Sequence, residues 1–220
     1  MALRKIDTFL CVVENANLMG KKIWGILKKV WKFIWNDDSI WSWLINAVLA
    51  FVLIKFIVYP GLGFALHTNH PVVAVISSSM EHQGDFDTWW KSMEQTYQKF
   101  SITKEQFQSF GMSGGFNTGD IIILKGKRPQ DIQIGDILVF QANTPEPIIH
   151  RVVNKTETDG TYYFSTKGDH NFGQRPEEVK ISQDRIVGTG YFRIPYVGYV
   201  KIFFTNAVNQ LRGNPASVPG

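Results

Sequence analysis

The stretch that decides the fold reads Val72-Val73-Ala74-Val75-Ile76-Ser77-Ser78-Ser79-Met80-Glu81. Its first five residues are apolar and mostly β-branched, which predicts a buried strand over 72–76. Three serines and a methionine then end the strand and place hydroxyl groups at its tip. Serine clusters after strands are commonly plain turns. A strand that carries a hydroxyl at its end can also present a nucleophile, and the flanking sequence decides between the two.

An apolar segment long enough to cross a membrane lies upstream of this stretch. Residues 40–54 carry no charge, Lys55 interrupts the segment, and apolar residues continue to Pro60. About 20 residues in a helix span roughly 30 Å, the thickness of a bilayer core. Lys55 lies near enough to the end for its amine to reach the interface. We therefore predict one transmembrane helix over 39–60, too far from the start for an ordinary cleaved signal peptide.

Residues 1–38 are basic and amphipathic. Residues 1–35 carry a net charge of +5, against +4 for the whole 220-residue chain, and five of the seven tryptophans lie between residues 24 and 43. Apolar residues recur at helical spacing from residue 19 to residue 35, which predicts a helix in the headgroup region or, alternatively, a helix packed on a soluble domain. The positive-inside rule predicts a cytoplasmic N-terminus. Since the basic charge is local, it does not indicate a nucleic-acid-binding protein.

Beyond the serine stretch, a helical region precedes a region of strands. The aromatic periodicity predicts a helix over 85–100, and Thr103 with Gln106 predicts a capping box for a second short helix. These helices fall in a segment, residues 83–117, that we call the helical insertion. Two interpretations stay open for it: a packing element, or a lid or membrane-dipping hairpin.

The rest of the chain to residue 205 reads as strands. They are expected at 120–124, 136–140, 148–155, 161–165 and 186–194. Asp159-Gly160 predicts a hairpin turn, the apolar segment 199–204 is too short to cross a bilayer, and residues 206–220 form a tail. Short strands without alternating helices predict a mainly β (α+β) domain over 71–205. The lone cysteine, Cys11, excludes an internal disulfide.

A serine nucleophile needs a base that titrates near neutrality and a group that orients the base. His150 lies in the strand 148–155, and Asp169 follows the next strand, so the hairpin between them can bring both to one sheet edge. Each residue alone also fits an ordinary packed histidine or a turn aspartate. His67 and His70 have no evident third ligand, and no metal or other cofactor is expected.

Taken in order, five segments resemble the membrane-bound type I signal peptidases, in the archaeal and endoplasmic-reticulum branch that uses Ser-His-Asp. The five segments are Val75-Ile76-Ser77-Ser78-Ser79-Met80-Glu81, Gly135-Asp136-Ile137-Leu138-Val139-Phe140, Ile149-His150-Arg151-Val152, Thr166-Lys167-Gly168-Asp169-His170-Asn171 and Ile194-Pro195-Tyr196-Val197-Gly198. The resemblance covers residues 40–205. It implies a single transmembrane helix followed by a β-rich signal-peptidase-like catalytic domain.

The resemblance also implies the roles of the site residues. Ser79 attacks the scissile carbonyl, His150 is the general base and then the acid, and Asp169 orients His150. The Ser79 amide and the Ser77 hydroxyl form the oxyanion hole. Ser78 and Met80 complete this oxyanion and substrate-binding box.

The implied substrates are secretory preproteins, cut after small residues on the outer face of the membrane. The lipid bilayer and the protein translocation machinery are the other implied partners, with no nucleic acid. An extended substrate is expected to pair with a sheet edge.

The sequence departs from the family pattern in several places. Ser78 stands where glycine is usual, which raises the question of a positive φ, and His82 stands where proline is usual. A second aspartate is missing near Arg175. Glu177 and Asp184 are therefore alternatives to Asp169 as the orienting residue.

Two other functions remain open at this stage. A non-catalytic membrane module of the same fold would bind signal segments or partner subunits without cutting. A self-cleaving Ser-Lys repressor-type peptidase fits less well, because the chain has a membrane anchor and a histidine at the base position.

Overall fold

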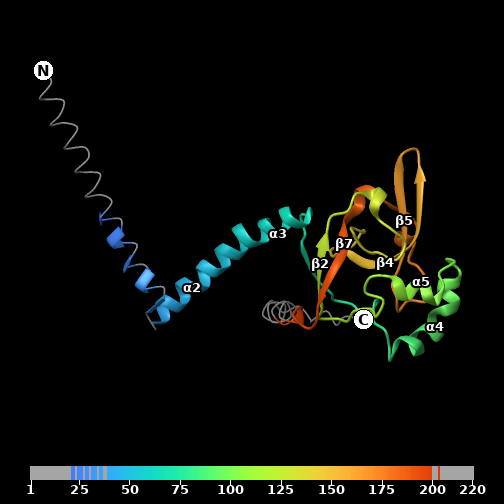
Figure 1. Ribbon diagram of the computed structural model, residues 1–220, viewed down its shortest axis with the longest axis horizontal. Helices are drawn as coiled ribbons and strands as arrows, with labels where there is room; N and C mark the ends of the chain where they lie inside the picture. Colours follow the sequence, from blue (N-terminus) through green and yellow to red (C-terminus); the bar gives the residue numbers. More distant parts are fainter. Residues whose placement is uncertain are drawn as a thin grey trace, which may run out of the picture. The chain divides into compact units, whose positions relative to one another are not determined.

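The computed structural model describes residues 39–199 continuously, together with 21–22, 24–26, 28–29, 31–33, 35–36 and 203 (Figure 1). The chain divides into two compact units, Met1–Tyr59 and Pro60–Gly220. The predictions for residues 1–20 and for the 206–220 tail fall outside the described residues. The apolar segment 199–204 is described only at its residues 199 and 203.

In the first unit, the described residues between 21 and 36 are helical, as the amphipathic pattern predicts. Trp31 and Trp35 stack one turn apart, with ring centroids separated by 4.6 Å. Ser39 caps the next helix, because its side chain accepts a hydrogen bond from the Ser42 amide. The location of the first helix in the headgroup region remains a prediction.

The apolar segment forms one helix of 27 residues, Ile40–Leu66. It consists of α2 (Ile40–Leu53), a π-helical turn η1 (Ile54–Val58) and α3 (Tyr59–Leu66). The helix thus continues through Pro60, where the sequence predicted its end. The wider π turn lies just before Pro60, where a proline ring would crowd a regular α-helical backbone. At 1.5 Å per residue the helix is about 40 Å long, enough to cross a bilayer core.

The second unit is built on a seven-stranded sheet in which all neighbours are antiparallel. The order is β1-β2-β7-β3-β4-β5-β6. The strands are β1 (Val72–Ala74), β2 (Ile121–Lys125), β3 (Ile137–Phe140), β4 (Ile148–Thr158), β5 (Thr161–Lys167), β6 (Ile181–Ser182) and β7 (Ile186–Ile194). The mainly β class that the sequence predicted is confirmed.

Several strand ends differ from the prediction by one to three residues, and one strand was not predicted. β1 ends at Ala74, two residues early, although Val75 keeps both backbone bonds: its amide donates to Asp120 O at 2.8 Å and its carbonyl accepts from Gly119 at 2.9 Å. β6 has only two residues, too few for any periodicity, and it was not predicted. The short helices η2 (Pro129–Asp131), α6 (Pro176–Val179) and η3 (Gln183–Arg185) join the later strands.

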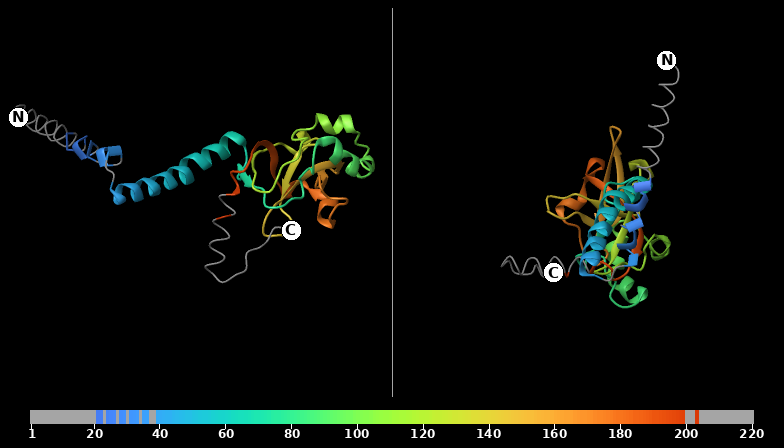
Figure 2. Two further views of the ribbon diagram at one scale, coloured as in Figure 1. Left: turned by 90° about the horizontal axis from the view of Figure 1, so that it is seen from below. Right: turned by 90° about the vertical axis from the view of Figure 1, so that its left-hand side faces the viewer.

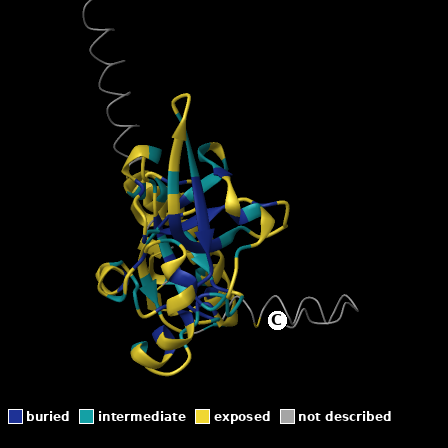
Figure 3. Ribbon diagram, turned by 90° about the vertical axis from the view of Figure 1, so that its right-hand side faces the viewer, coloured by how far each residue is buried: buried dark blue, intermediate teal, exposed yellow. Residues whose placement is uncertain are grey.

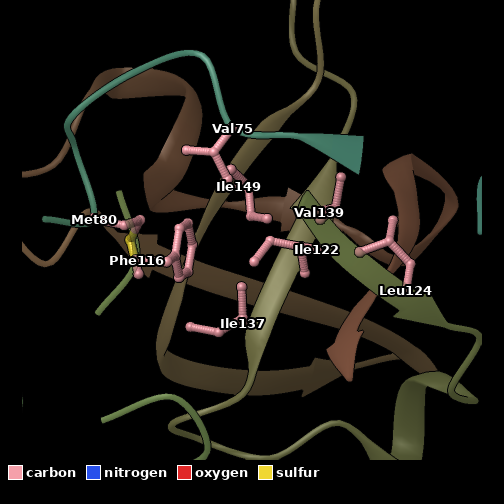
Figure 4. Packing of buried hydrophobic residues seen from close by; sticks show 8 residues of the cluster. All are labelled: Val75, Met80, Phe116, Ile122, Leu124, Ile137, Val139 and Ile149. Carbon is pink, nitrogen blue, oxygen red and sulfur yellow. The ribbon is translucent and has the colours of Figure 1, made fainter. Parts of the chain in front are cut away.

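The core lies on both faces of β3, whose four residues are all buried. Ile137 and Val139 belong to one apolar cluster, while Leu138 and Phe140 belong to another with Phe164. Figure 4 shows the first cluster, in which Met80 from the serine stretch lies beside Phe116. The β4–β5 hairpin is buried at its base and exposed at its tip (Figure 3).

The helical insertion contains α4 (Phe86–Gln98) and α5 (Lys104–Ser109). Asp85 caps α4, and the predicted Thr103–Gln106 capping box opens α5. Aromatic side chains of both helices form a third buried cluster, which includes Val153 of β4. The two helices lie together beside the sheet (Figure 2). The insertion is thus a packing element, the first of its two interpretations.

Candidate active site

Backbone contacts on several sides hold Ser79 in place. Its carbonyl accepts from the His170 amide at 2.8 Å, and the next carbonyl, of Met80, accepts from the Phe116 amide at 3.1 Å. Glu81 closes the turn by donating its amide to Ser78 O at 3.0 Å. Ser79 itself is half-buried, so its hydroxyl is held yet reachable.

His150 lies on β4 and meets this hydroxyl. It pairs with Leu138 of β3, and only 2% of its surface is exposed. The ring atom Nε2 lies 2.9 Å from Ser79 Oγ. The structure thus brings together the two residues predicted as nucleophile and base, at hydrogen-bonding distance.

The other ring nitrogen of His150 is hydrogen-bonded to Glu178, on α6. His150 Nδ1 contacts Glu178 Oε1, and Glu178 is fully buried. A carboxylate acceptor at Nδ1 favours the tautomer with the proton on Nδ1. Nε2 is then free to accept the proton of Ser79 Oγ, which is the tautomer a general base requires.

Sequence reasoning missed Glu178, although a local signal was present. Pro176 occupies the first turn of α6, and Glu178 is the third helical residue, the position from which a glutamate reaches back to the helix start. Its second oxygen, Oε2, indeed accepts from the Arg175 amide at 2.7 Å. This capping bond fixes the carboxylate and leaves Oε1 for His150.

Asp169, the residue expected to orient His150, has other partners. Its carboxylate accepts from Arg151 Nε at 2.9 Å and Nη2 at 2.7 Å, from the Tyr97 hydroxyl at 2.7 Å and from His82 Nε2 at 3.1 Å. The expectation is corrected because strand alternation points Arg151 away from its neighbour His150. Asp169 is paired with Arg151 and therefore lies on the face of β4 opposite to His150.

The two alternative carboxylates also lie elsewhere. Glu177 is half-buried on α6, next to Glu178, and Asp184 is exposed in η3. Asp184 pairs locally with the Ser182 hydroxyl. Neither is hydrogen-bonded to His150 among the residues that the structure describes.

The remaining residues of the serine stretch take distinct places. Ser77 Oγ lies 3.2 Å from Ser79 Oγ, beside the attacking atom. Ser78 is not among the residues with positive φ, so serine in place of glycine causes no backbone strain there. The side chain of Met80 is buried in the core, where its sulfur accepts from the Asp169 amide at 3.3 Å. Met80 is therefore a packing residue in the structure.

Gly168 fits closely against the Ser79–His150 pair. A Cβ atom at this position would lie 2.8 Å from Ser79 O and 2.9 Å from His150 Nε2. On one side of this glycine, Lys167 is buried and donates from Nζ to Gly168 O at 2.8 Å. The glycine thus permits the turn at 167–169 to lie directly on the pair.

Charge and burial shift the pKa values around this turn. Burial lowers the pKa of Lys167 to about 8, against a smaller opposing effect of Asp169. Burial alone would raise the pKa of Asp169, but Arg151 and the hydrogen bonds from His82 and Arg151 together hold it far below its usual value. Asp169 therefore stays ionised as the counter-charge of Arg151.

The fold and the site together define a class: a serine peptidase domain with a Ser-His pair, behind one apolar helix long enough to span a membrane. The chain is similar to signal peptidase complex catalytic subunits. It is 27% identical to SEC11C of Homo sapiens over 194 residues, which cover 85% of this chain and 81% of the relative. It is 27% identical to SEC11 of Lachancea thermotolerans over 159 residues, 68% of this chain and 75% of the relative.

A third relative, SEC11 of Colletotrichum graminicola, is 28% identical over 170 residues, 73% of this chain and 80% of the relative. No protein-family model matches the chain. The chain is a distant homologue of these signal peptidase complex catalytic subunits over most of its length.

Proposed function

We propose that the protein is a signal peptidase that removes signal peptides from secretory preproteins after small residues, with Ser79 as nucleophile, His150 as general base and Glu178 as the orienting carboxylate. The homology supports signal peptidase activity. The 2.9 Å contact between Ser79 Oγ and His150 Nε2 carries the assignment of the residues.

The reaction follows from this geometry. His150 Nε2 takes the proton of Ser79 Oγ as that oxygen attacks the scissile carbonyl carbon. The C–N bond breaks when the imidazolium returns the proton to the leaving amine, which leaves an acyl group on Ser79. Water, deprotonated by His150, then releases the acid and restores the serine. Glu178 stabilises the imidazolium in both steps.

The developing oxyanion needs donors beside the nucleophile. The proposed donors are the Ser79 amide and the hydroxyl of Ser77, which already lies 3.2 Å from Ser79 Oγ. A donor of this kind contributes about 3 kcal/mol to transition-state stability. Ser78 shapes the same turn through its carbonyl.

A pocket of about 390 Å³ lies along β1, the strand that leads to Ser79. β1 is the first strand of the sheet and has one unpaired edge. The lining of the pocket includes Val72, Ala74 and Ile76 and the loop residues 145–147. An extended substrate segment added to this edge would place alternate side chains in the pocket.

The membrane topology is part of the proposal. The basic residues before the helix favour a cytoplasmic N-terminus, with residues 71–205 as the peptidase domain on the outer face. The end of α3 is tied to the residue that follows β2, since Leu66 O accepts from the Gly126 amide at 2.7 Å. Secretory preproteins, the lipid bilayer and the protein translocation machinery are the proposed partners.

Cleavage of a detergent-solubilised preprotein tests this function. Ser79→Ala and His150→Ala should each lower kcat by about 10³-fold or more, because the two residues act as a unit. Ser109→Ala, in an exposed serine of α5, is the matched control and should cleave like the wild type. Equal cleavage by the wild type and Ser79→Ala would refute the proposal.

The alternative of a non-catalytic module rested on a missing second aspartate near Arg175. Glu178 supplies a buried carboxylate at this place. Crosslinking to preproteins without turnover by the wild-type protein would favour the module. For a Ser-Lys mechanism, the relevant observation is that the amine of buried Lys167 donates to Gly168 O, while Ser79 Oγ pairs with His150.

A further inference from the structure

Tyr97, in the last turns of α4, contacts both residues that flank Gly168. Its hydroxyl donates to Asp169 Oδ1 at 2.7 Å, and its ring lies under the amine of Lys167, with Nζ 4.3 Å from the ring centroid. Tyr97 is fully buried. A single side chain of the helical insertion therefore holds the 167–169 turn from both ends.

The same helix also reaches the segment of the nucleophile. His82, three residues after Ser79, stacks on Trp89 of α4 with centroids 3.6 Å apart and planes 6° from parallel. Its Nε2 donates to Asp169 Oδ2 at 3.1 Å, while its Nδ1 has no partner among the described residues. Only 4% of the His82 side chain is exposed.

The contacts of Tyr97 and His82 both act on segments that adjoin the Ser79–His150 pair. The turn at 167–169 presses Gly168 against Ser79 O and His150 Nε2, with no room for one more carbon atom. His82 is covalently linked, through two residues, to Ser79. A shift of α4 would therefore move both segments that fix the distance between Ser79 Oγ and His150 Nε2.

From these contacts we propose that Tyr97 and His82 are positioning residues, through which the helical insertion sets the alignment of Ser79 with His150. The proposal rests on the proposed function. It gives the insertion a part in catalysis, in addition to its packing. Among the described residues, neither side chain is hydrogen-bonded to Ser79 or His150; each acts through the turn or the strand end that it holds.

A purely structural role would predict something different. Any loss of packing in the aromatic cluster would then lower stability and leave the kcat of the folded protein unchanged. A positioning role predicts a lower kcat at unchanged KM, in a variant that remains folded, because misalignment by a fraction of an ångström affects the chemical step.

Preprotein cleavage by the full-length chain in detergent separates these cases. Tyr97→Phe keeps the ring in the cluster and over Lys167, but removes the donor to Asp169. His82→Phe keeps a ring against Trp89 and removes the other donor. We expect each to lower kcat about tenfold with KM within twofold, and the double variant to lower it further.

Met93→Ala is the matched control. Met93 is buried in the same cluster, and its loss should lower the unfolding temperature while leaving kcat unchanged below the transition. The proposal is overturned if Tyr97→Phe and His82→Phe, folded as judged by thermal unfolding, retain wild-type kcat, or if Met93→Ala loses kcat equally. Ser79→Ala separates failure of the positioning proposal from failure of the proposed function. Only the proposed function fails if the wild type and Ser79→Ala cleave the preprotein alike.

Discussion

Two buried carboxylates lie on opposite sides of the same strand, and they differ in what surrounds them. Glu178 accepts one bond from His150 and one from a backbone amide. Asp169 accepts from Arg151, Tyr97 and His82. The neighbouring residues His150 and Arg151 point to opposite faces of β4, and each meets its own carboxylate.

The different partners of the two carboxylates suit different roles: Glu178 for the proposed catalysis, and Asp169 for holding the structure around the site. In the proposed mechanism, Glu178 faces a group that gains and loses a proton during the reaction, so its charge is needed when the imidazolium forms. Asp169 faces a guanidinium that stays charged, since the pKa of Arg151, which burial alone would lower, is raised by Asp169. The first carboxylate should therefore act mainly on rate. The second should act mainly on stability, with a smaller effect on rate through the 167–169 turn.

Glu178→Gln tests the catalytic side and has the largest expected effect. A neutral amide cannot stabilise the imidazolium, and its NH₂ group favours the tautomer in which Nε2 is protonated. We expect kcat to fall by about 10³- to 10⁴-fold. Steady-state cleavage of a preprotein by purified protein measures this.

The neighbouring residue provides the control for this prediction. Glu177→Gln makes the same chemical change one position earlier on α6, in a half-buried side chain. It should leave kcat within about twofold of the wild type, since a side chain remote from His150 contributes little to transition-state stability. A loss in Glu177→Gln with none in Glu178→Gln would reverse the assignment.

Asp169→Asn tests the supporting side. It leaves the Arg151 guanidinium buried without a counter-charge, which should cost about 3–5 kcal/mol of unfolding free energy. Urea unfolding in a fixed detergent measures the loss. Asp136→Asn is the control, because Asp136 pairs with Lys127 at 2.7 Å in a partly exposed place, and it should cost less than about 1 kcal/mol. Equal losses would show that burial of the Arg151 pair is not decisive.

Much of the fold follows from the sequence for clear physical reasons. The uncharged run before Lys55, the period of the aromatic residues in α4 and the apolar runs of β3 and β4 are each long enough to carry a pattern. β6 has two residues and carries none. The helix passes through Pro60 just after a π turn, and no local sequence pattern predicts that turn.

The site was harder to predict, because it depends on contacts between distant segments. Ser79 and His150 were predicted as a pair because each stands in a recognisable segment, and the structure places them at hydrogen-bonding distance. Asp169 was misassigned because it lies in such a segment too, and only three-dimensional packing shows that it serves Arg151. The Pro176–Glu178 capping pattern could be recognised in the sequence. The contact of Glu178 Oε1 with His150 could not, because it joins distant segments.

The smallest of the predicted effects concerns Lys167, which lies close to Asp169 in the chain. Burial disfavours the charged form of its amine. Its pKa is about 8 in the folded protein, below the ordinary 10.5. Between these values the unfolded chain binds a proton that the folded chain does not, so stability rises with pH across this window. Relative to Lys167→Met, the wild type should gain up to about 3 kcal/mol of unfolding free energy between pH 7 and pH 10.5. Parallel urea titrations of the two proteins measure this difference, and a difference that is constant with pH would show that Lys167 titrates alike in both states.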